Sequence, residues 1–293
     1  MERLKNIWLD GKFVPWNQAT THILTHGLHY GSSVFEGIRF YKTSNGPKIF
    51  RLNEHLKRFF YSARSLGLKI PYTQKTLTAA CKKLVTKSGM KDGYLRPLAF
   101  YGVKNLSILP IGFPIRVALI PSLWPAKKNV LNICLSPYIR IHPQSTDVHA
   151  KIGGHYVNSI VALMDARKRG FDEVIFLDDR GYVAEGAVAN VFMIKNGTIY
   201  TPKVPSILPG ITRDTIIELV RREFKKRVIE KDMRLSELLA ADEVFFTGTA
   251  YEVTPIARIG TKRFAISSMT KRIRDSYTDV VRGKLARYRS WLV

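Results

Sequence analysis

A lysine at position 151 stands among small residues in the stretch HAKIGGHYVNSI (149–160). A free lysine has a pKa of about 10.4, so a lysine that forms a Schiff base needs help from its surroundings. The neighbouring alanine and glycines would let a flat, bulky partner approach the backbone. Tyr156 could offer its phenol to a hydrogen bond beside the imine. Locally, the same residues also fit a solvent-exposed Lys151 in a glycine-rich loop before a helix.

The stretch LPGITRD (208–214) could bind a phosphate group. It places Gly210, Ile211 and Thr212 where a helix is expected to begin, directly after a proline. The N–H groups and the dipole of a helix N-terminus favour an anion, and the Thr212 hydroxyl could add a hydrogen bond. An ordinary helix start without a ligand is the alternative.

A second possible anion site lies in FFTGTAYE (245–252). Gly248 and Thr249 stand at the end of a predicted strand, where a tight turn can direct two amides inward. A plain hairpin turn explains these residues equally well. Arg51, at the end of PKIFRL, could neutralise a phosphate dianion, although an isolated arginine is usually a surface ion-pair partner.

Glu185 is an acid among small apolar residues in YVAEGAVANVF (182–192). A carboxylate in an apolar setting needs a partner, or it takes up a proton. A protonated pyridine nitrogen would be such a partner, and the pair would hold the ring as an electron sink. A turn glutamate that faces water is the alternative. Taken together, a lysine nucleophile, two amide-rich anion sites and this carboxylate describe a pocket for pyridoxal 5'-phosphate.

The elements that must position these residues are a mixture of strands and helices. Alternating apolar residues predict a hairpin at 6–15 and strands at 34–41, 47–52, 93–101, 114–121, 132–136, 172–178, 181–186, 189–195, 242–249 and 252–258. Apolar residues three and four apart predict helices at 53–67, 73–89, 155–169, 210–224, 236–241 and 269–288. Asn53 and Thr73 are the expected N-caps of the first two helices, and Gly67 and Gly89 their expected ends.

The order of these elements predicts an α+β protein with two domains. Hairpin connections dominate the first part of the chain, so we expect antiparallel or mixed sheets rather than a doubly wound dinucleotide fold. The polar, proline-containing stretch SLWPAKKN interrupts the pattern and is typical of an interdomain linker. We therefore predict a smaller N-terminal domain at 1–121, a linker at 122–130 and a larger C-terminal, cofactor-binding domain at 131–293.

The composition is that of a folded globular protein with an unusual charge. Of 293 residues, 45% are hydrophobic, and 47 basic against 23 acidic residues give a formal net charge of +24. Such a charge could indicate a nucleic-acid-binding protein, but the basic residues are scattered and no zinc-finger, helix-turn-helix or aromatic RNA-binding motif accompanies them. We expect a basic surface without a nucleic-acid partner.

Localisation and metal content follow from what the sequence lacks. The first residues hold no apolar run typical of a signal peptide, and no stretch approaches the roughly 20 apolar residues that span a bilayer. Cys81 and Cys134 form no metal-ligand spacing and suit a reducing interior. We expect a cytoplasmic protein without a metal site.

Six motifs, in order, resemble the fold-type IV pyridoxal phosphate enzymes, the fold of D-amino-acid aminotransferase. They are HGLHYGSSVFEGIR (26–39), YLRP (94–97), AKIGGHYVNS (150–159), EGxxxNxF (185–192), LPGITRD (208–214) and GTAxE (248–252). Within that class the chain is similar to the branched-chain amino-acid aminotransferases, over about residues 6 to 280. The resemblance implies a homodimer that transfers the amino group between L-leucine, L-isoleucine or L-valine and 2-oxoglutarate.

The resemblance also implies roles for individual residues. Lys151 would carry the cofactor as a Schiff base and shuttle the proton, while Tyr156 would bond the phenolic oxygen and Glu185 the ring nitrogen. The residues implied around the cofactor phosphate are Arg51, Gly210, Ile211, Thr212, Gly248 and Thr249. The residues implied around the substrate are Tyr94, Thr249 and Ala250 for the α-carboxylate, Arg96 for the second carboxylate of glutamate, and Phe35, Gly37, Trp124 and a partner subunit's Tyr30 for the apolar side chain.

The chain departs from the family pattern in the carboxylate motif. Branched-chain enzymes usually read close to EGSGENLF, whereas residues 185–192 read EGAVANVF, with Ala189 in place of the acid. This difference bears on the substrate more than on the cofactor. A D-amino-acid aminotransferase or an aminodeoxychorismate lyase on the same fold therefore stays open, as does, more remotely, a nucleic-acid-binding protein on a lapsed enzyme scaffold.

Overall fold

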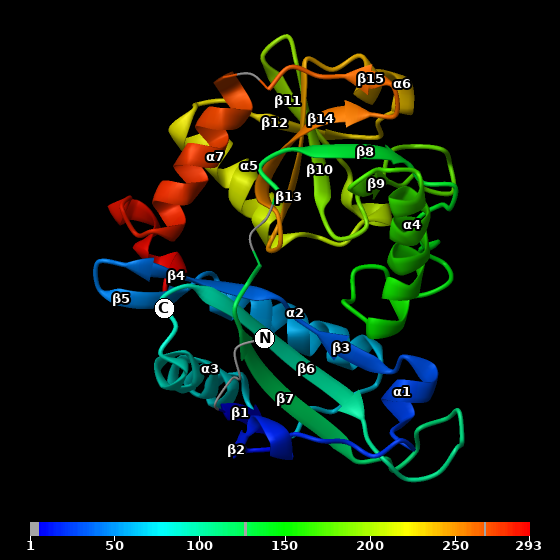
Figure 1. The fold of residues 1–293 in the computed structure, drawn as a ribbon, viewed down its shortest axis with the longest axis vertical. Coiled ribbons are helices and arrows are strands. Elements are labelled where there is room, and N and C mark those ends of the chain that lie inside the picture. Colours follow the sequence, from blue (N-terminus) through cyan, green and yellow to red (C-terminus); the bar gives the residue numbers. More distant parts are fainter. Residues whose placement is uncertain (1–5, 126–127, 267) are drawn as a thin grey trace. The chain divides into compact units, whose positions relative to one another are not determined.

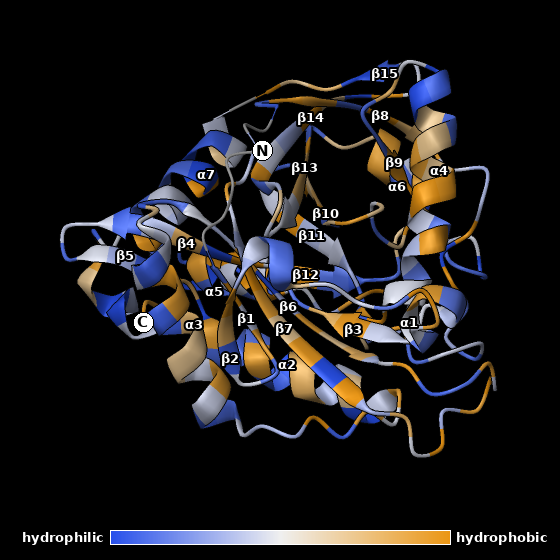
Figure 2. Cartoon of the chain, turned by 60° about the horizontal axis from the view of Figure 1, so that its bottom comes forward, coloured by the Kyte–Doolittle hydropathy of each residue, from blue (hydrophilic) through white to orange (hydrophobic). Residues whose placement is uncertain are grey.

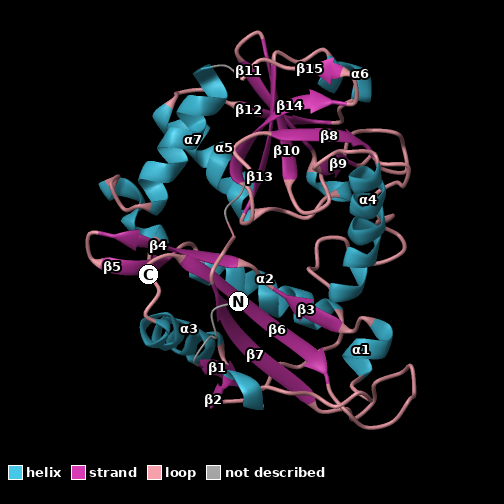
Figure 3. Cartoon of the chain, in the orientation of Figure 1, coloured by secondary structure: helices cyan, strands magenta, loops and turns pink. Residues whose placement is uncertain are grey.

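The computed structural model describes residues 6–125, 128–266 and 268–293, which form two compact units (Figure 1). Unit 1 contains 6–125 together with two short segments, 150–155 and 280–293. Unit 2 contains the described residues of 128–149 and 156–279. The segment that carries Lys151 therefore folds with the N-terminal part of the chain. Each unit mixes helices and strands, so the α+β prediction is confirmed (Figure 3).

Unit 1 is built on an antiparallel sheet with two long helices. The strands run in the order β2-β1-β7-β6-β4-β5, and β3 also pairs with β6. Their bounds are β1 (Asn6–Leu9), β2 (Lys12–Pro15), β3 (Ser33–Phe35), β4 (Ile38–Thr43), β5 (Gly46–Ile49), β6 (Gly93–Tyr101) and β7 (Ile115–Ser122). The helices are α1 (His26–Tyr30), α2 (Leu52–Ser65) and α3 (Gln74–Ser88). The apolar stripes of α2 and α3 pack with the sheet into one core, which includes Trp8, Leu56, Leu77 and Val117.

Two details of unit 1 differ from the prediction. The strand predicted at 34–41 is divided at Glu36, opposite Pro97 of β6, which has no N–H group to continue the ladder. The N-cap predicted at Asn53 is wrong, because α2 begins at Leu52 and Arg51 precedes it in the left-handed conformation, with φ 51°.

Helix α3 of unit 1 begins and ends where its local sequence predicts. Its N-cap at Thr73 is confirmed, because the Thr73 side chain accepts a hydrogen bond from the N–H of Thr76. Its end at Gly89 is also confirmed, with φ 68°.

Unit 2 is built on a mixed sheet of eight strands in the order β12-β11-β10-β13-β14-β8-β9, with β15 against β14. The pairs β11–β12, β8–β14 and β8–β9 are parallel and the others antiparallel. The strand bounds are β8 (Leu131–Leu135), β9 (Glu173–Ile175), β10 (Asn190–Lys195), β11 (Thr198–Pro202), β12 (Val228–Lys231), β13 (Glu243–Gly248), β14 (Glu252–Ile259) and β15 (Lys262–Arg263). The helices are α4 (Tyr156–Lys168), α5 (Ile211–Glu223), α6 (Leu235–Leu239) and α7 (Ser268–Val281).

Two predictions for the second half of the chain are wrong. The strand predicted at 181–186 is a loop that makes only single bridges, one of them between Leu177 and Val183. The helix predicted at 269–288 ends at Val281, because Gly283 turns the chain with φ 73° and a short 3-10 helix at Ala286–Trp291 follows. Within the described ranges, none of the helices combines the length and the apolar character needed to cross a membrane.

Candidate active site

Lys151 lies in an extended segment that is held on both sides within unit 1. Its N–H donates to the Ser62 hydroxyl of α2 (2.8 Å), and its carbonyl accepts from the N–H of Phe35 at the end of β3 (3.1 Å). The next residue forms an isolated bridge with Val34. The side-chain ammonium lies 4.7 Å from the centroid of the Phe35 ring. The backbone at Lys151 is therefore fixed, while its flexible side chain extends over an aromatic face.

The glycines that follow Lys151 have a structural purpose of their own. A Cβ at Gly153 would lie 2.2 Å from the Ser33 hydroxyl, and a Cβ at Gly31 would lie 2.8 Å from the Cα of Gly154. The N–H of Gly154 also donates to the Gly31 carbonyl (3.0 Å). The sequence suggested that these glycines make room for a bulky partner. In unit 1 they instead allow the main chain at Gly31 and Ser33 to approach closely.

Five predicted substrate residues come together in unit 1. The Arg96 guanidinium lies over the rings of Phe35 and Tyr94, 4.6 and 5.3 Å from their centroids, and donates from Nη2 to the Tyr94 hydroxyl (3.0 Å). Tyr94 stacks on Trp124 with 4.4 Å between ring centroids. A Cβ at Gly37 would lie 2.1 Å from the Tyr94 hydroxyl, so only glycine fits there. Among the described residues, nothing accepts a hydrogen bond from the buried Nε of Arg96.

Arg51 and Tyr30, the other predicted residues of unit 1, have different surroundings. The Arg51 side chain is almost buried, donates from Nε to Glu54 (2.9 Å) and lies 4.9 Å from the centroid of the Trp291 ring. Tyr30, at the end of α1, is 43% exposed and donates its hydroxyl to the Leu106 carbonyl (2.9 Å).

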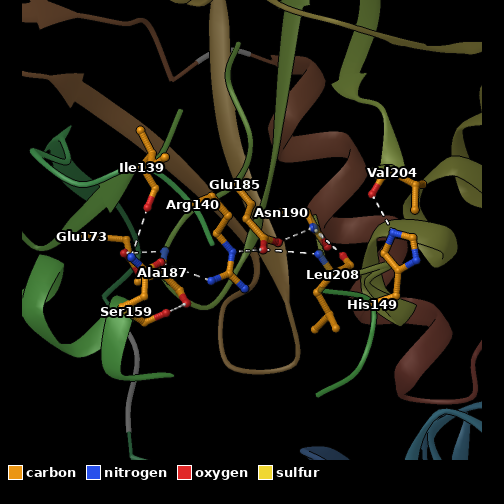
Figure 4. A network of polar contacts seen from close by, with 11 residues as sticks. Ile139, Arg140, His149, Ser159, Glu173, Glu185, Ala187, Asn190, Val204 and Leu208 are labelled. Atoms are coloured by element: carbon orange, nitrogen blue, oxygen red, sulfur yellow. Dashed lines mark hydrogen bonds and ion pairs between the residues drawn. The ribbon is translucent and has the colours of Figure 1, made fainter. Parts of the chain in front are cut away.

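In unit 2, Glu185 is the centre of a buried polar network (Figure 4). Its Oε1 accepts hydrogen bonds from Nε of Arg140 (2.8 Å) and from the N–H of Leu208 (3.3 Å). Its Oε2 accepts from the side-chain amide of Asn190 (3.0 Å), which also donates to the Leu208 carbonyl (3.0 Å). The carboxylate is therefore ion-paired and oriented by the protein, not turned toward water as the alternative interpretation required.

The helix start predicted as a phosphate site lies directly beside this network. Gly210 occupies the N-cap of α5 and offers no side-chain acceptor to the first turn. A Cβ at Gly210 would lie 2.0 Å from Oδ1 of Asn190, so a larger residue cannot be accommodated without a shift. Ile211 and Thr212 open the helix and are buried. Asn190 thus connects the Glu185 carboxylate to the N-terminus of α5.

The second predicted anion site is the turn between β13 and β14. Gly248 pairs with Glu252, and Thr249 and Ala250 lie in the turn between them, partly buried. A Cβ at Gly248 would lie 3.2 Å from the Val188 carbonyl, so this turn runs close to the loop that follows Glu185. Tyr156 is the first residue of α4 in the same unit.

Sequence reasoning missed Arg140, Glu36, Arg58 and His55, four ionisable residues that the structure brings to these regions. Arg140 pairs with Glu185; its place between two isoleucines is a sign of burial that could have been noticed. In unit 1, Glu36 accepts a bidentate pair from Arg58 (2.6 and 3.0 Å). It also accepts from Nδ1 of His55 (2.7 Å), and the charge of Lys151 is one of those that act on this histidine. The described residues contain no group of three or more His, Cys, Asp or Glu side chains that could hold a metal ion.

Comparisons with known proteins agree with this arrangement. Residues 33–259 match the family described as Amino-transferase class IV. The chain is 39% identical to the branched-chain-amino-acid aminotransferase of Pseudomonas aeruginosa, over 97% of this chain and 95% of that protein. It is 36% identical to the enzyme of the same name from Escherichia coli, over 98% and 96%.

A solved structure extends the similarity to the whole fold. The T.th. branched-chain amino acid aminotransferase, complexed with N-(5'-phosphopyridoxyl)-L-glutamate, superposes with a TM-score of 0.96 at 39% identity. The match covers 99% of this chain and 98% of that one, and it confirms the expected fold class.

Proposed function

The chain belongs to the Amino-transferase class IV family, and we propose that it is a pyridoxal 5'-phosphate-dependent aminotransferase of branched-chain amino acids. It would interconvert L-leucine, L-isoleucine or L-valine and 2-oxoglutarate with the branched 2-oxo acids and L-glutamate. The observation that carries this proposal is the setting of Arg96, an arginine with an unsatisfied buried Nε against the rings of Phe35 and Tyr94. The rings suit a branched side chain, and the guanidinium suits the second carboxylate of glutamate.

The residues of unit 2 fit the cofactor. A buried carboxylate held by Arg140 and Asn190 suits a protonated ring nitrogen, so we assign that contact to Glu185. A helix start with a glycine N-cap suits a phosphate. We assign the phosphate to Gly210, Ile211, Thr212, Gly248 and Thr249 of unit 2. The resemblance adds Arg51 of unit 1 to the proposed phosphate residues. When bound, pyridoxal phosphate supplies a ring that takes up the electrons left on the substrate Cα.

Lys151 is the proposed catalytic residue. Its amine would attach the cofactor covalently and then carry the proton that leaves and returns at the substrate Cα. Because Ser62 and Phe35 fix its backbone, only the side chain has to move between these tasks. Tyr156 would donate its phenol to the phenolic oxygen of the cofactor.

The substrate contacts are divided by chemistry. The amides at Thr249 and Ala250, together with the Tyr94 hydroxyl, would receive the α-carboxylate that all substrates share. Arg96 would bind only the acidic side chain. The apolar side chain would contact Phe35, Gly37 and Trp124, with Tyr30 of the partner subunit.

A donor panel with the cofactor-loaded full chain tests this proposal. We expect kcat/KM with 2-oxoglutarate as acceptor to be highest for L-leucine, L-isoleucine and L-valine. A preference for D-alanine would indicate a D-amino-acid aminotransferase instead. Lys151→Ala should abolish turnover and the visible absorption band of the Schiff base between lysine and cofactor, whereas Lys168→Ala, at the exposed end of α4, should leave both intact. Turnover by the Lys151 variant at the wild-type rate would refute its catalytic role.

We also infer that two copies of the chain form a homodimer. In unit 1, α1 and the loop after β6 expose large apolar side chains, among them Leu28, Ile108 and Ile111 at 60%, 75% and 72%. In unit 2, hydrophobic residues recur along α4 (Figure 2). Ala162 is buried, whereas Ile160, Val161 and Met164 are exposed. Such surfaces are typical of a protein interface. Light scattering after size exclusion should give twice the mass of the chain, and Ile108→Asp should lower it.

The remaining proposals concern boundaries and location. We keep 1–121, 122–130 and 131–293 as the proposed N-terminal domain, linker and C-terminal cofactor-binding domain along the sequence, with 150–155 and 280–293 as two segments that fold with unit 1. We propose a cytoplasmic location, which suits an enzyme with two unpaired, buried cysteines.

A further inference from the structure

Glu173 is a buried carboxylate that the proposed chemistry does not use. It lies on β9 with none of its surface exposed, and it accepts three hydrogen bonds. Its Oε1 accepts from the N–H of Val174 (2.9 Å) and of Ala187 (3.0 Å), and its Oε2 accepts from the Tyr251 hydroxyl (3.0 Å). Three separate segments of unit 2 therefore meet at one side chain.

The contact between Glu173 and Ala187 fixes the loop that follows Glu185. Ala187 is held from two sides, because its N–H donates to Glu173 and its carbonyl accepts from the Ser159 hydroxyl of α4 (2.7 Å), as Figure 4 shows. The same loop closes on itself through the N–H of Gly186, which donates to the Ala189 carbonyl (2.7 Å). Only Gly186 stands between Ala187 and Glu185 in the chain, so this anchor sets where the Glu185 backbone lies.

The contact between Glu173 and Tyr251 fixes the turn between β13 and β14. Tyr251 directly follows Thr249 and Ala250, and its own carbonyl accepts from the Thr254 hydroxyl (2.5 Å). Its ring packs 6.2 Å from that of Phe246 on β13. The bond from the Tyr251 hydroxyl to Glu173 is thus a tie between this turn and β9.

We propose that Glu173 is a positioning residue that holds the loop carrying Glu185 and the turn carrying Thr249 in one fixed arrangement. The inference rests on the proposed function, which gives the loop to the cofactor ring and the turn to the phosphate and the substrate α-carboxylate. A carboxylate is suited to this task because it only accepts hydrogen bonds, so three donors from three segments can converge on it. An apolar residue in its place would remove the acceptors of the Ala187 N–H and the Tyr251 hydroxyl.

The burial of this acid supports a specific task. Burial raises the pKa of Glu173 to about 7, although its hydrogen bonds and the charge of Arg167 on α4 oppose the rise. Asp172, next to it on the chain, Tyr251 and the Cys134 thiol are titratable groups near it. Burying a carboxylate without an ion pair costs free energy, so we expect Glu173 to serve the segments that it positions.

Tyr251→Phe tests the tie with the smallest possible change, and Tyr200→Phe on β11 is the matched control. We expect Tyr251→Phe to raise KM by the same factor, about three- to tenfold, for leucine and for glutamate, because both share the α-carboxylate. The dissociation constant for pyridoxal phosphate, followed by its absorbance, should rise by a comparable factor. The kcat value should change by less than about twofold. The control should match the wild type in all of these.

Glu173→Gln shows whether the effect passes through Glu173. A glutamine keeps the shape, and its amide bonds the phenol more weakly than a carboxylate does, so adding Tyr251→Phe to this variant should change KM less than it does in the wild type. Unchanged KM and cofactor affinity in Tyr251→Phe, or a full effect in the double variant, would overturn the inference. A lowered melting temperature alone would show that the contact only supports the fold. A wild type without leucine activity would refute the proposed function instead. The affinity of Tyr251→Phe for pyridoxal phosphate would then still show whether the bond between Tyr251 and Glu173 positions the turn.

Discussion

Glu36 in unit 1 and Glu173 in unit 2 are both fully buried carboxylates, but their partners differ in charge. Glu36 accepts hydrogen bonds from the guanidinium of Arg58 and from the imidazole of His55. Glu173 accepts two main-chain N–H groups and a phenol, all of them neutral. Each acid thus accepts hydrogen bonds on both of its oxygens, and of the two only Glu36 has an ion pair with a described residue.

The difference decides which form of each acid the fold favours. Burial by itself raises the pKa of both carboxyls. At Glu36 the charges and hydrogen bonds of Arg58 and His55 outweigh burial and hold the pKa well below its ordinary value of 4.5. At Glu173 burial prevails, and the pKa rises to about 7. The charge of the partners, more than the number of hydrogen bonds, therefore determines how far the pKa of a buried acid departs from its ordinary value, and in which direction.

Removing the counter-charge in unit 1 should have the largest effect. Arg58→Met leaves Glu36 buried with His55 and a main-chain N–H as its remaining partners among the described residues, and breaking a buried pair in this way typically costs about 3–5 kcal/mol. We expect a large fall in the urea midpoint at pH 7. The fall should be smaller at pH 5, because the unpaired carboxyl can then take up a proton. Arg64→Met, on the exposed face of the same helix, is the control, and equal losses in both variants would contradict the comparison.

Replacing Glu173 of unit 2 by a neutral residue should change stability in the opposite direction: relative to the wild type, the variant should gain stability as the pH rises. Because the pKa of Glu173 is higher in the folded than in the unfolded chain, the folded state binds more protons between pH 4.5 and about 7. The free energy of unfolding therefore falls as the pH rises through this window, by up to about 3 kcal/mol from this group. Glu173→Gln removes that fall. We expect its stability relative to the wild type to increase between pH 5 and pH 8 in urea titrations; a constant difference would show that Glu173 does not titrate there.

Much of the fold could be predicted because its signals are local. The hairpin at Asp10-Gly11 and the capped helix from Thr73 to Gly89 depend on residues close together in sequence. The pairing of Ile152 with Val34 leaves no local pattern, so nothing in the sequence indicates that 150–155 folds with unit 1. The division of β3 from β4 depends in the same way on Pro97, a residue of another strand.

In the candidate site, too, the contacts between residues far apart in sequence could not be predicted. Lysine, glutamate and glycine in small-residue settings pointed to the chemistry, and the structure does bring Phe35, Tyr94, Arg96 and Trp124 together. The partners that orient the charged groups were missed, because Arg140 is 45 residues from Glu185 and Tyr251 is 78 from Glu173. Contacts at such separations arise from the topology of the sheet and have no spacing that a sequence displays.

The smallest expected effect concerns Arg96, a partly buried charge with an incomplete set of partners. Arg58 donates to both carboxylate oxygens of Glu36, whereas Nε of Arg96 has no acceptor among the described residues, and we expect the second carboxylate of glutamate to supply it. Arg96→Met should therefore raise KM for glutamate and 2-oxoglutarate by about 10- to 150-fold, the effect of losing about 1.5–3 kcal/mol of charge-assisted hydrogen bonding. KM for leucine should change far less, because methionine preserves the apolar contact with Phe35. If Arg96 only braced β6, both donors would lose activity together and the melting temperature would fall. A selective loss for the acidic donor, at unchanged melting temperature, distinguishes a charge kept for the substrate from one already paired within the fold.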